Sequence, residues 1–258
     1  MTSRLLTLAV AATLTLNAGC SGKKKPEITP PASAQAPTPG VAASRPRFSL
    51  RQQIIKVAQQ EWEFFGKQTV RLEGSEESIP HVGKWEDDGD PWSSRVNWYW
   101  NAVGKPGLDG YDCKEPWSAA FISWVMRQAG LSESQFPPSD AHWHYIRYFV
   151  EHSGYSGLPF VSHRIGEYSP KPGDLICATR GNSGFIPVYE GSPGSVLMGH
   201  TKLHCDIVVE KQGAMLATIG GNVRNSVSKT FFPLDGNGLL RPSERRPWFV
   251  VLENRLSP

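Results

Sequence analysis

The fold of this chain is decided by the stretch Pro116-Trp117-Ser118-Ala119-Ala120-Phe121-Ile122-Ser123-Trp124. Proline suits the first turn of a helix, because the N–H that it lacks would have no acceptor there. Gly130 suits the position just after a helix end. The stretch therefore predicts a helix over about residues 116–129. Its centre is apolar nearly all round, so we expect this helix to be the central buried one.

Three further helices are expected around this one. Apolar residues recur at helical spacing over residues 50–65, and the pattern stops at Gly66. A second helix is expected to begin at Asp90-Pro91, where a capping residue precedes proline. A fourth is expected after a cap at Ser139 or Asp140. Residues 67–89 are polar and are expected to be irregular.

The pattern changes from about residue 170, where short apolar runs bounded by turn residues predict strands. They are expected over residues 173–178, 204–210, 214–219, 229–234 and 248–252. Helices followed by antiparallel strands indicate an α+β fold in one domain, with the N-terminal helices packed on an antiparallel sheet. Residues 179–203, rich in Gly and Ser, are expected to form a long loop.

Ser118 is the first candidate for chemistry. A side chain in the first turn of a helix lies near free backbone N–H groups, but a serine hydroxyl also needs a positioned base to act as a nucleophile. His204 is the candidate base, and strand alternation places it on the same face as Asp206. Either Asp206 or Asn222 could orient its ring. The simpler alternative is that Ser118 only caps its own helix.

Two other residues are alternatives for the site. Cys113 precedes the central helix and is an alternative nucleophile, and His142 is an alternative site residue on the fourth helix. Alternation separates His204 from Cys205, which argues against a zinc site. We therefore expect no metal and no cofactor.

The N-terminus has the features of an export signal. Residues 1–19 combine one basic residue, a short apolar run and a small-residue cleavage pattern, and Cys20 follows at once. We interpret 1–19 as a signal peptide and Cys20 as a lipidation site that anchors the chain to a membrane. Residues 20–47 are Pro- and Ala-rich and are expected to be a disordered tether, and 48–258 the globular domain. The expected location is the cell envelope, on the periplasmic face of the outer membrane.

Lipidation of Cys20 would leave three cysteines in an oxidising compartment. Cys177 and Cys205 fall on neighbouring predicted strands and form a possible disulfide, with Cys113 left over. The formal net charge of +3 shows no basic footprint of a nucleic-acid binder, so no nucleic acid is expected as a partner.

Several motifs resemble those of known cell-wall enzymes. The helix that carries Ser118 resembles the nucleophile helix of CHAP and NlpC-type cell-wall hydrolases, with Ser where those enzymes have Cys. Pro172-Gly173-Asp174-Leu175 resembles their first core strand, His204 with Ile207-Val208-Val209 their histidine strand, and Gly220-Gly221-Asn222 their third polar position. The set is also similar to an uncharacterised bacterial lipoprotein family, domain of unknown function 2272.

This resemblance implies a papain-like α+β fold and cleavage of peptide or amide bonds in peptidoglycan. The expected activity is therefore that of a peptidoglycan amidase or endopeptidase that acts through a Ser118–His204 pair. The alternative is a catalytically inactive lipoprotein that binds peptidoglycan, a wall peptide or another partner on the same fold.

Overall fold

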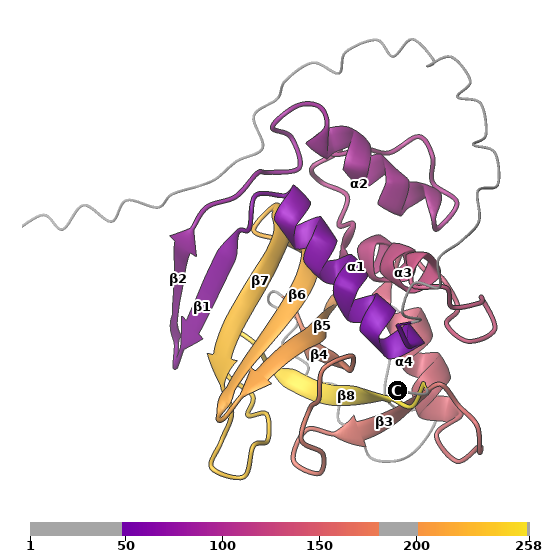
Figure 1. Ribbon diagram of the computed structural model, residues 1–258, viewed down its shortest axis with the longest axis vertical. Helices are drawn as coiled ribbons and strands as arrows, with labels where there is room; N and C mark the ends of the chain where they lie inside the picture. Colours follow the sequence, from indigo (N-terminus) through magenta and orange to yellow (C-terminus); the bar gives the residue numbers. More distant parts are fainter. Residues whose placement is uncertain (1–47, 181–200, 257–258) are drawn as a thin grey trace, which may run out of the picture.

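The computed structural model describes residues 48–180 and 201–256, which fold as an α+β unit (Figure 1). The α+β prediction is confirmed. The helices of this part are α1 (Leu50–Phe64), α2 (Trp92–Asn101), α3 (Ser118–Gln128) and α4 (His142–Glu151). The signal peptide, Cys20, the tether and most of the loop predicted at 179–203 lie outside the described residues. Among the helices that are described, none is both long and apolar enough to cross a membrane.

One sheet contains the eight strands of the described residues. They are β1 (Thr69–Glu73), β2 (Glu76–His81), β3 (Phe160–Arg164), β4 (Leu175–Thr179), β5 (Leu203–Gln212), β6 (Met215–Val223), β7 (Ser226–Pro233) and β8 (Trp248–Asn254). Their order across the sheet is β2-β1-β7-β6-β5-β4-β8-β3. β1 runs parallel to β7, while the other neighbouring pairs are antiparallel. The sheet is therefore mixed. The prediction of a purely antiparallel sheet is wrong at the edge where β1 pairs with β7.

The strands at both edges of the sheet were not predicted from the sequence. Residues 67–89 were expected to be irregular, yet β1 and β2 form a hairpin there. β2 is exposed at five of its six positions, so it lacks the alternation of apolar and polar residues that marks a half-buried strand. β3 pairs with β8 at the opposite edge and was also not predicted.

The helices cover one face of this sheet. Figure 1 shows α1 lying across β5, β6 and β7, with α3 beside it. α3 packs on β5 and β6, and every residue from Ser118 to Met126 is buried. α4 packs against β3 and β5. The helix that carries Ser118 is therefore the central one, held between α1, α2 and the sheet.

A second cluster of buried apolar residues, separate from the one beneath the helices, includes Phe232 and Trp248 and shows that the sheet is curved. The rings of Phe232 on β7 and Trp248 on β8 stack 5.3 Å apart, although three strands lie between these two in the sheet.

Cys177 on β4 and Cys205 on β5 are register partners and form a disulfide, with their Cα atoms 4.1 Å apart. The disulfide joins the two strands one residue away from His204.

The turn before β4 is fixed by its own residues. Gly173 has a φ of 96°, a left-handed conformation that glycine adopts without steric cost. The Asp174 carboxylate accepts the backbone N–H groups of Lys171, at 2.7 Å, and Asn254, at 2.9 Å. These bonds connect the start of β4 to the end of β8.

Candidate active site

Ser118 is the first residue of α3, at the end of the helix where backbone donors are free. The first helical hydrogen bond runs from the Phe121 N–H to the Trp117 carbonyl, at 2.9 Å. The three N–H groups before Phe121 therefore have no acceptor within the helix. No side chain caps this end of α3. These donors and the positive end of the helix dipole lie beside the Ser118 hydroxyl.

His142 is the hydrogen-bond partner of Ser118. Its Nε2 lies 2.5 Å from Ser118 Oγ, and both residues are buried. Two bonds hold the start of α4 against α3: the Ser139 N–H donates to Ser123 Oγ, and the Ser123 hydroxyl donates to the Ser139 carbonyl, each at 3.0 Å. His142 follows three residues later, so this clamp places its ring over the N-terminus of α3.

The protonation state of His142 suits a proton acceptor. Burial lowers its pKa well below the ordinary value, and the charges of His204 and Arg180 act in the same direction. The ring is therefore neutral near pH 7. Its Nδ1 lies against the Tyr145 hydroxyl. In the tautomer with the proton on Nδ1, that N–H donates to the Tyr145 oxygen and Nε2 accepts from Ser118.

His204 and Asp206 form a second buried pair beside the first. Strand alternation places both on one face of β5, and His204 Nε2 lies 2.9 Å from Asp206 Oδ1. Burial opposes the charge of Asp206, but His204 holds the pKa of this carboxyl below its usual range. Burial lowers the pKa of His204, although Asp206 acts against this. The His142 and His204 rings lie edge to face, with centroids 5.6 Å apart.

This arrangement corrects the pairing expected from the sequence. The structure joins Ser118 to His142 and joins His204 to Asp206, so the direct Ser118–His204 contact is not formed. The reason is tertiary: the Ser123–Ser139 clamp places the ring of His142 against both Ser118 and the ring of His204. The sequence indicated His142 only as an alternative site residue, because no local pattern predicts that its side chain packs against the N-terminus of α3.

Asn222 and Cys113 lie at the same site without the roles expected of them. Asn222 has a φ of 55° and lines the cavity at Ser118, but the ring contact of His204 goes to Asp206. Asp206 rather than Asn222 is therefore placed to orient His204. Cys113 lines the same cavity from the segment before α3, but it is disulfide-bonded, so the prediction that it is left over as an unpaired thiol and could act as the nucleophile is wrong.

A cavity of about 670 Å³ opens over these groups. Ser118 and His142 line it together with Arg180, Lys202 and Asn222. Sequence reasoning did not single out Arg180 or Lys202, because an isolated basic residue beside a loop carries no local signal of a site. Their positive charges favour a ligand that carries negative charge.

Glu86 holds the start of α3 in place through a hydrogen bond. Its carboxylate accepts the indole N–H of Trp117, the residue just before Ser118, and its own backbone N–H donates to the Asn225 carbonyl at 2.7 Å. Burial raises the pKa of Glu86 to about 7, while the bond from Trp117 acts against this rise. Glu86 therefore links α3 to the turn between β6 and β7 and titrates near neutral pH.

The two glycines of Gly220-Gly221 permit the close approaches around this site. A Cβ at Gly220 would lie 1.8 Å from Asp206 Oδ1, and a Cβ at Gly221 would lie 2.5 Å from Phe121 Cβ. Gly220 therefore leaves room for the His204–Asp206 pair. Gly221 lets β6 pack directly against α3.

We expect Gly220→Ala and Gly221→Ala each to lower the free energy of unfolding by about 1–3 kcal/mol, the usual cost of overpacking. The measurement is chemical denaturation. Gly236→Ala is the matched control, since a Cβ there meets nothing within 4 Å. A loss at Gly220 or Gly221 no larger than at Gly236 would contradict these close approaches.

Residues 82–254 match a family model described as an uncharacterized protein conserved in bacteria (DUF2272). The matched range covers α2, α3, α4 and the strands from β3 to β8, and so contains Ser118, His142 and the His204–Asp206 pair. Comparison with curated proteins and with solved structures gave no match.

Proposed function

The chain belongs to the uncharacterised bacterial family DUF2272, and on that premise we propose that it is a serine hydrolase of the cell envelope that cleaves amide bonds in peptidoglycan. One observation carries the proposal: Ser118 Oγ lies 2.5 Å from His142 Nε2 at the N-terminus of a buried helix, on the wall of a cavity of about 670 Å³. A nucleophile, a base and backbone donors are thereby gathered at one point.

In the first step, Ser118 Oγ attacks the carbonyl carbon of the amide and His142 Nε2 takes the hydroxyl proton. The developing oxyanion accepts hydrogen bonds from the free N–H groups at the start of α3. His142 then gives its proton to the departing amine as the C–N bond breaks. Tyr145 holds Nδ1 throughout and so fixes the orientation of the ring.

The second step releases the acyl group from Ser118. A water molecule gives a proton to His142 Nε2 as it attacks the ester carbonyl, and the proton passes to Ser118 Oγ when that bond breaks. The His204–Asp206 pair lies against His142 and supports its ring. In this proposal His204 is a positioning residue and the base is His142.

The substrate class and the papain-like character of the fold rest on the resemblance of the Ser118, His204 and Gly220-Gly221-Asn222 motifs to cell-wall hydrolases. The proposed lipid anchor at Cys20 and location in the envelope are consistent with this substrate. The anchor is tested by growing cells with an alkyne-labelled palmitate. The label should appear on the wild-type chain and be absent from Cys20→Ser, and an unlabelled wild-type chain would refute the anchor.

The catalytic proposal is tested with a fluorophosphonate probe and with peptidoglycan. The probe should label the wild-type chain and not Ser118→Ala, and mass spectrometry should find released peptide fragments with the wild type alone. Ser118→Cys provides a comparison, because its thiol is the more nucleophilic group. Fragments released equally by Ser118→Ala would remove Ser118 from the mechanism.

A second function, binding without catalysis, is favoured by one observation. Ser118 is only 2% exposed and His142 only 5% exposed, so a bound ligand could lie in the cavity without reaching the hydroxyl. The same experiments separate the two functions. A binding protein would retain peptidoglycan in a pull-down assay, would resist the probe and would release no fragments.

The pH dependence follows from the depressed pKa of His142. Because the base must be neutral, we expect the rate of probe labelling to stay level from pH 8 down to 6.5 and to fall only below that. Labelling rates measured between pH 4.5 and 8 check this. A half-maximal rate at or above pH 6.5 would contradict the environment assigned to His142.

A further inference from the structure

A second cavity, of about 440 Å³, adjoins the first on the other side of Arg180. Four arginines line it, together with His204 and two glutamates: Arg180, Arg224, Arg245, Arg246, Glu77 and Glu244. Four positive charges against two negative charges leave an excess of two positive charges around this space. Arginine is the residue best suited to bind a planar carboxylate through paired hydrogen bonds.

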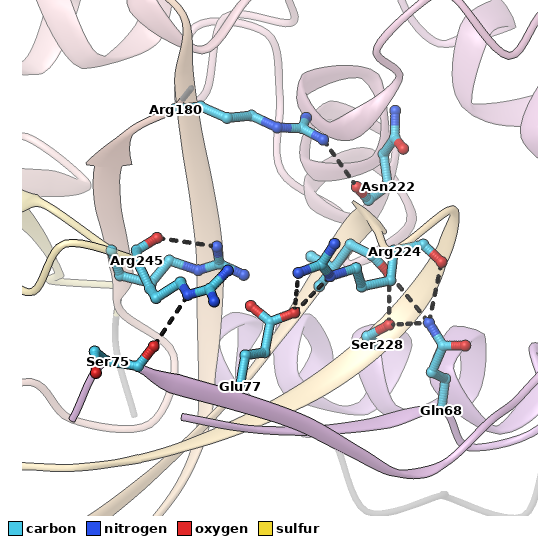
Figure 2. Close-up of polar contacts among 10 residues, drawn as sticks. Gln68, Ser75, Glu77, Arg180, Asn222, Arg224, Ser228 and Arg245 are labelled. Atoms are coloured by element: carbon cyan, nitrogen blue, oxygen red, sulfur yellow. Dashed lines mark hydrogen bonds and ion pairs between the residues drawn. The ribbon is translucent and has the colours of Figure 1, made fainter. Parts of the chain in front are cut away.

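The arginines are held in place by the hairpin of β1 and β2. Figure 2 shows Glu77 reaching up between Arg245 and Arg224, with Arg180 above them. Arg224 forms an ion pair with Glu77, whose side chain is only 5% exposed. Arg245 Nε donates to the Ser75 carbonyl at 3.1 Å. A carbonyl carries no formal charge, so of these two contacts only the one to Glu77 offsets an arginine charge.

Buried polar atoms around the same cavity have no protein partner. They include His204 Nδ1 and Arg246 Nε, and both residues line the cavity. Buried polar groups are nearly always hydrogen-bonded, and each one left without a partner costs free energy. Desolvation lowers the pKa of Arg180 and the nearby charge of Arg246 lowers it further, although the carboxylates of Asp206 and Glu86 act against this. A bound anion would relieve the repulsion between these guanidinium groups.

The two cavities are adjacent. Arg180 and Asn222 line both, and Arg180 donates to the Asn222 carbonyl at 3.5 Å. The ring of His204, which lines the second cavity, lies 5.6 Å from that of His142, which lines the first. A chain-like ligand could therefore occupy both spaces at once.

We propose that the arginine-lined cavity binds a carboxylate of the substrate, so that the site selects an acidic peptide. To call this ligand a substrate rests on the proposed function. The binding of a carboxylate in the cavity does not, because it requires no reactive Ser118. Arg180 and Arg246 bind the carboxylate, while Arg224 and Arg245 hold the cavity open through Glu77 and Ser75. The β1–β2 hairpin thereby becomes part of the binding site.

Calorimetric titration of the full chain with N-acetylglutamate tests this proposal. The neutral analogue N-acetylglutamine amide and inorganic phosphate are titrated beside it. We expect N-acetylglutamate to bind, with a Kd at least tenfold lower than that of either other ligand. Binding should weaken as salt is added, because screening reduces the attraction. Phosphate bound more tightly than N-acetylglutamate, or equal binding of the neutral analogue, would overturn the carboxylate assignment.

Substitutions then locate the binding. Arg246→Gln should raise the Kd at least tenfold, and Arg246→Lys, which keeps the charge, should raise it less. Arg241→Gln is the control, since Arg241 is exposed, pairs with Asp235 and does not line the cavity. If Arg246→Gln keeps its melting temperature and still binds like the wild type, the proposal is wrong.

The two proposals fail separately in these experiments. Ser118→Ala should bind N-acetylglutamate with the wild-type Kd, whatever becomes of its reaction with the probe. Labelling of the wild-type chain by the fluorophosphonate together with no binding of N-acetylglutamate would support the proposed function and overturn the carboxylate subsite. If Ser118→Ala no longer binds N-acetylglutamate, the ligand binds at Ser118 itself, and the proposal of a separate carboxylate subsite is wrong.

Discussion

Replacing His142 with glutamine should lower the rate at which a fluorophosphonate labels Ser118 by about 10²- to 10⁴-fold, the usual contribution of a general base. Glutamine fills a similar space and can still contact Ser118, but it cannot accept the hydroxyl proton at neutral pH. The labelling rate, measured from fluorescence on gels over time, checks the expectation. Replacing Ser118 itself with alanine should abolish labelling.

His204→Gln is the matched comparison for this prediction. The ring of His204 lies beside that of His142 but makes no hydrogen bond to Ser118, so its replacement should lower the labelling rate far less. Melting temperatures of both variants show whether each remains folded. A loss in His204→Gln as large as that in His142→Gln would return the role of base to His204, as the sequence suggested.

Replacing Glu86 with glutamine should raise the free energy of unfolding by about 3 kcal/mol at pH 8 and change it little at pH 4. The pKa of Glu86 is about 7 in the folded protein and 4.5 for an ordinary glutamate. The folded state therefore holds its proton more tightly, which stabilises the protein fully below pH 4.5. That contribution is lost as the pH rises toward 7. A neutral amide does not titrate, so the variant avoids this loss and can still accept the Trp117 N–H.

Urea denaturation at pH 4, 6 and 8 measures this difference. Glu73→Gln is the control, because its side chain is 72% exposed and its contact with Arg71 is long, at 3.9 Å. That substitution should change stability little at any of these pH values. A Glu86→Gln variant less stable than the wild type at pH 8 would mean that the folded protein stabilises the ionised carboxylate, which contradicts a raised pKa.

The local pattern of the sequence was sufficient for the elements that contribute a face to the core. Pro116 and Gly130 bracket α3, and the apolar centre between them is buried as expected. Alternation on β5 predicted that His204 and Asp206 share a face, and they are hydrogen-bonded to each other. These predictions succeed because periodicity is a property of the backbone itself and depends on no distant contact.

The β1–β2 hairpin escaped prediction for the converse reason. Its second strand is exposed at nearly every position, so burial leaves no period in the sequence. The local sequence also gives no sign of the role proposed for this hairpin, because Glu77 acts through Arg224, a partner 147 residues away in the chain. The same holds for the arginine-lined cavity, whose members come from separate loops and strand ends.

The sequence by itself determined which residues could react: a serine at a helix start, a histidine and an aspartate on one strand face, and a second histidine on another helix. Only the tertiary structure decided their partners. The Ser123–Ser139 clamp places His142 against Ser118 and against the ring of His204, whose hydrogen bond to Asp206 stays within β5. Spacing along the chain specifies the direction of a side chain, whereas its neighbour is set by how whole elements pack, and that depends on every buried residue at once.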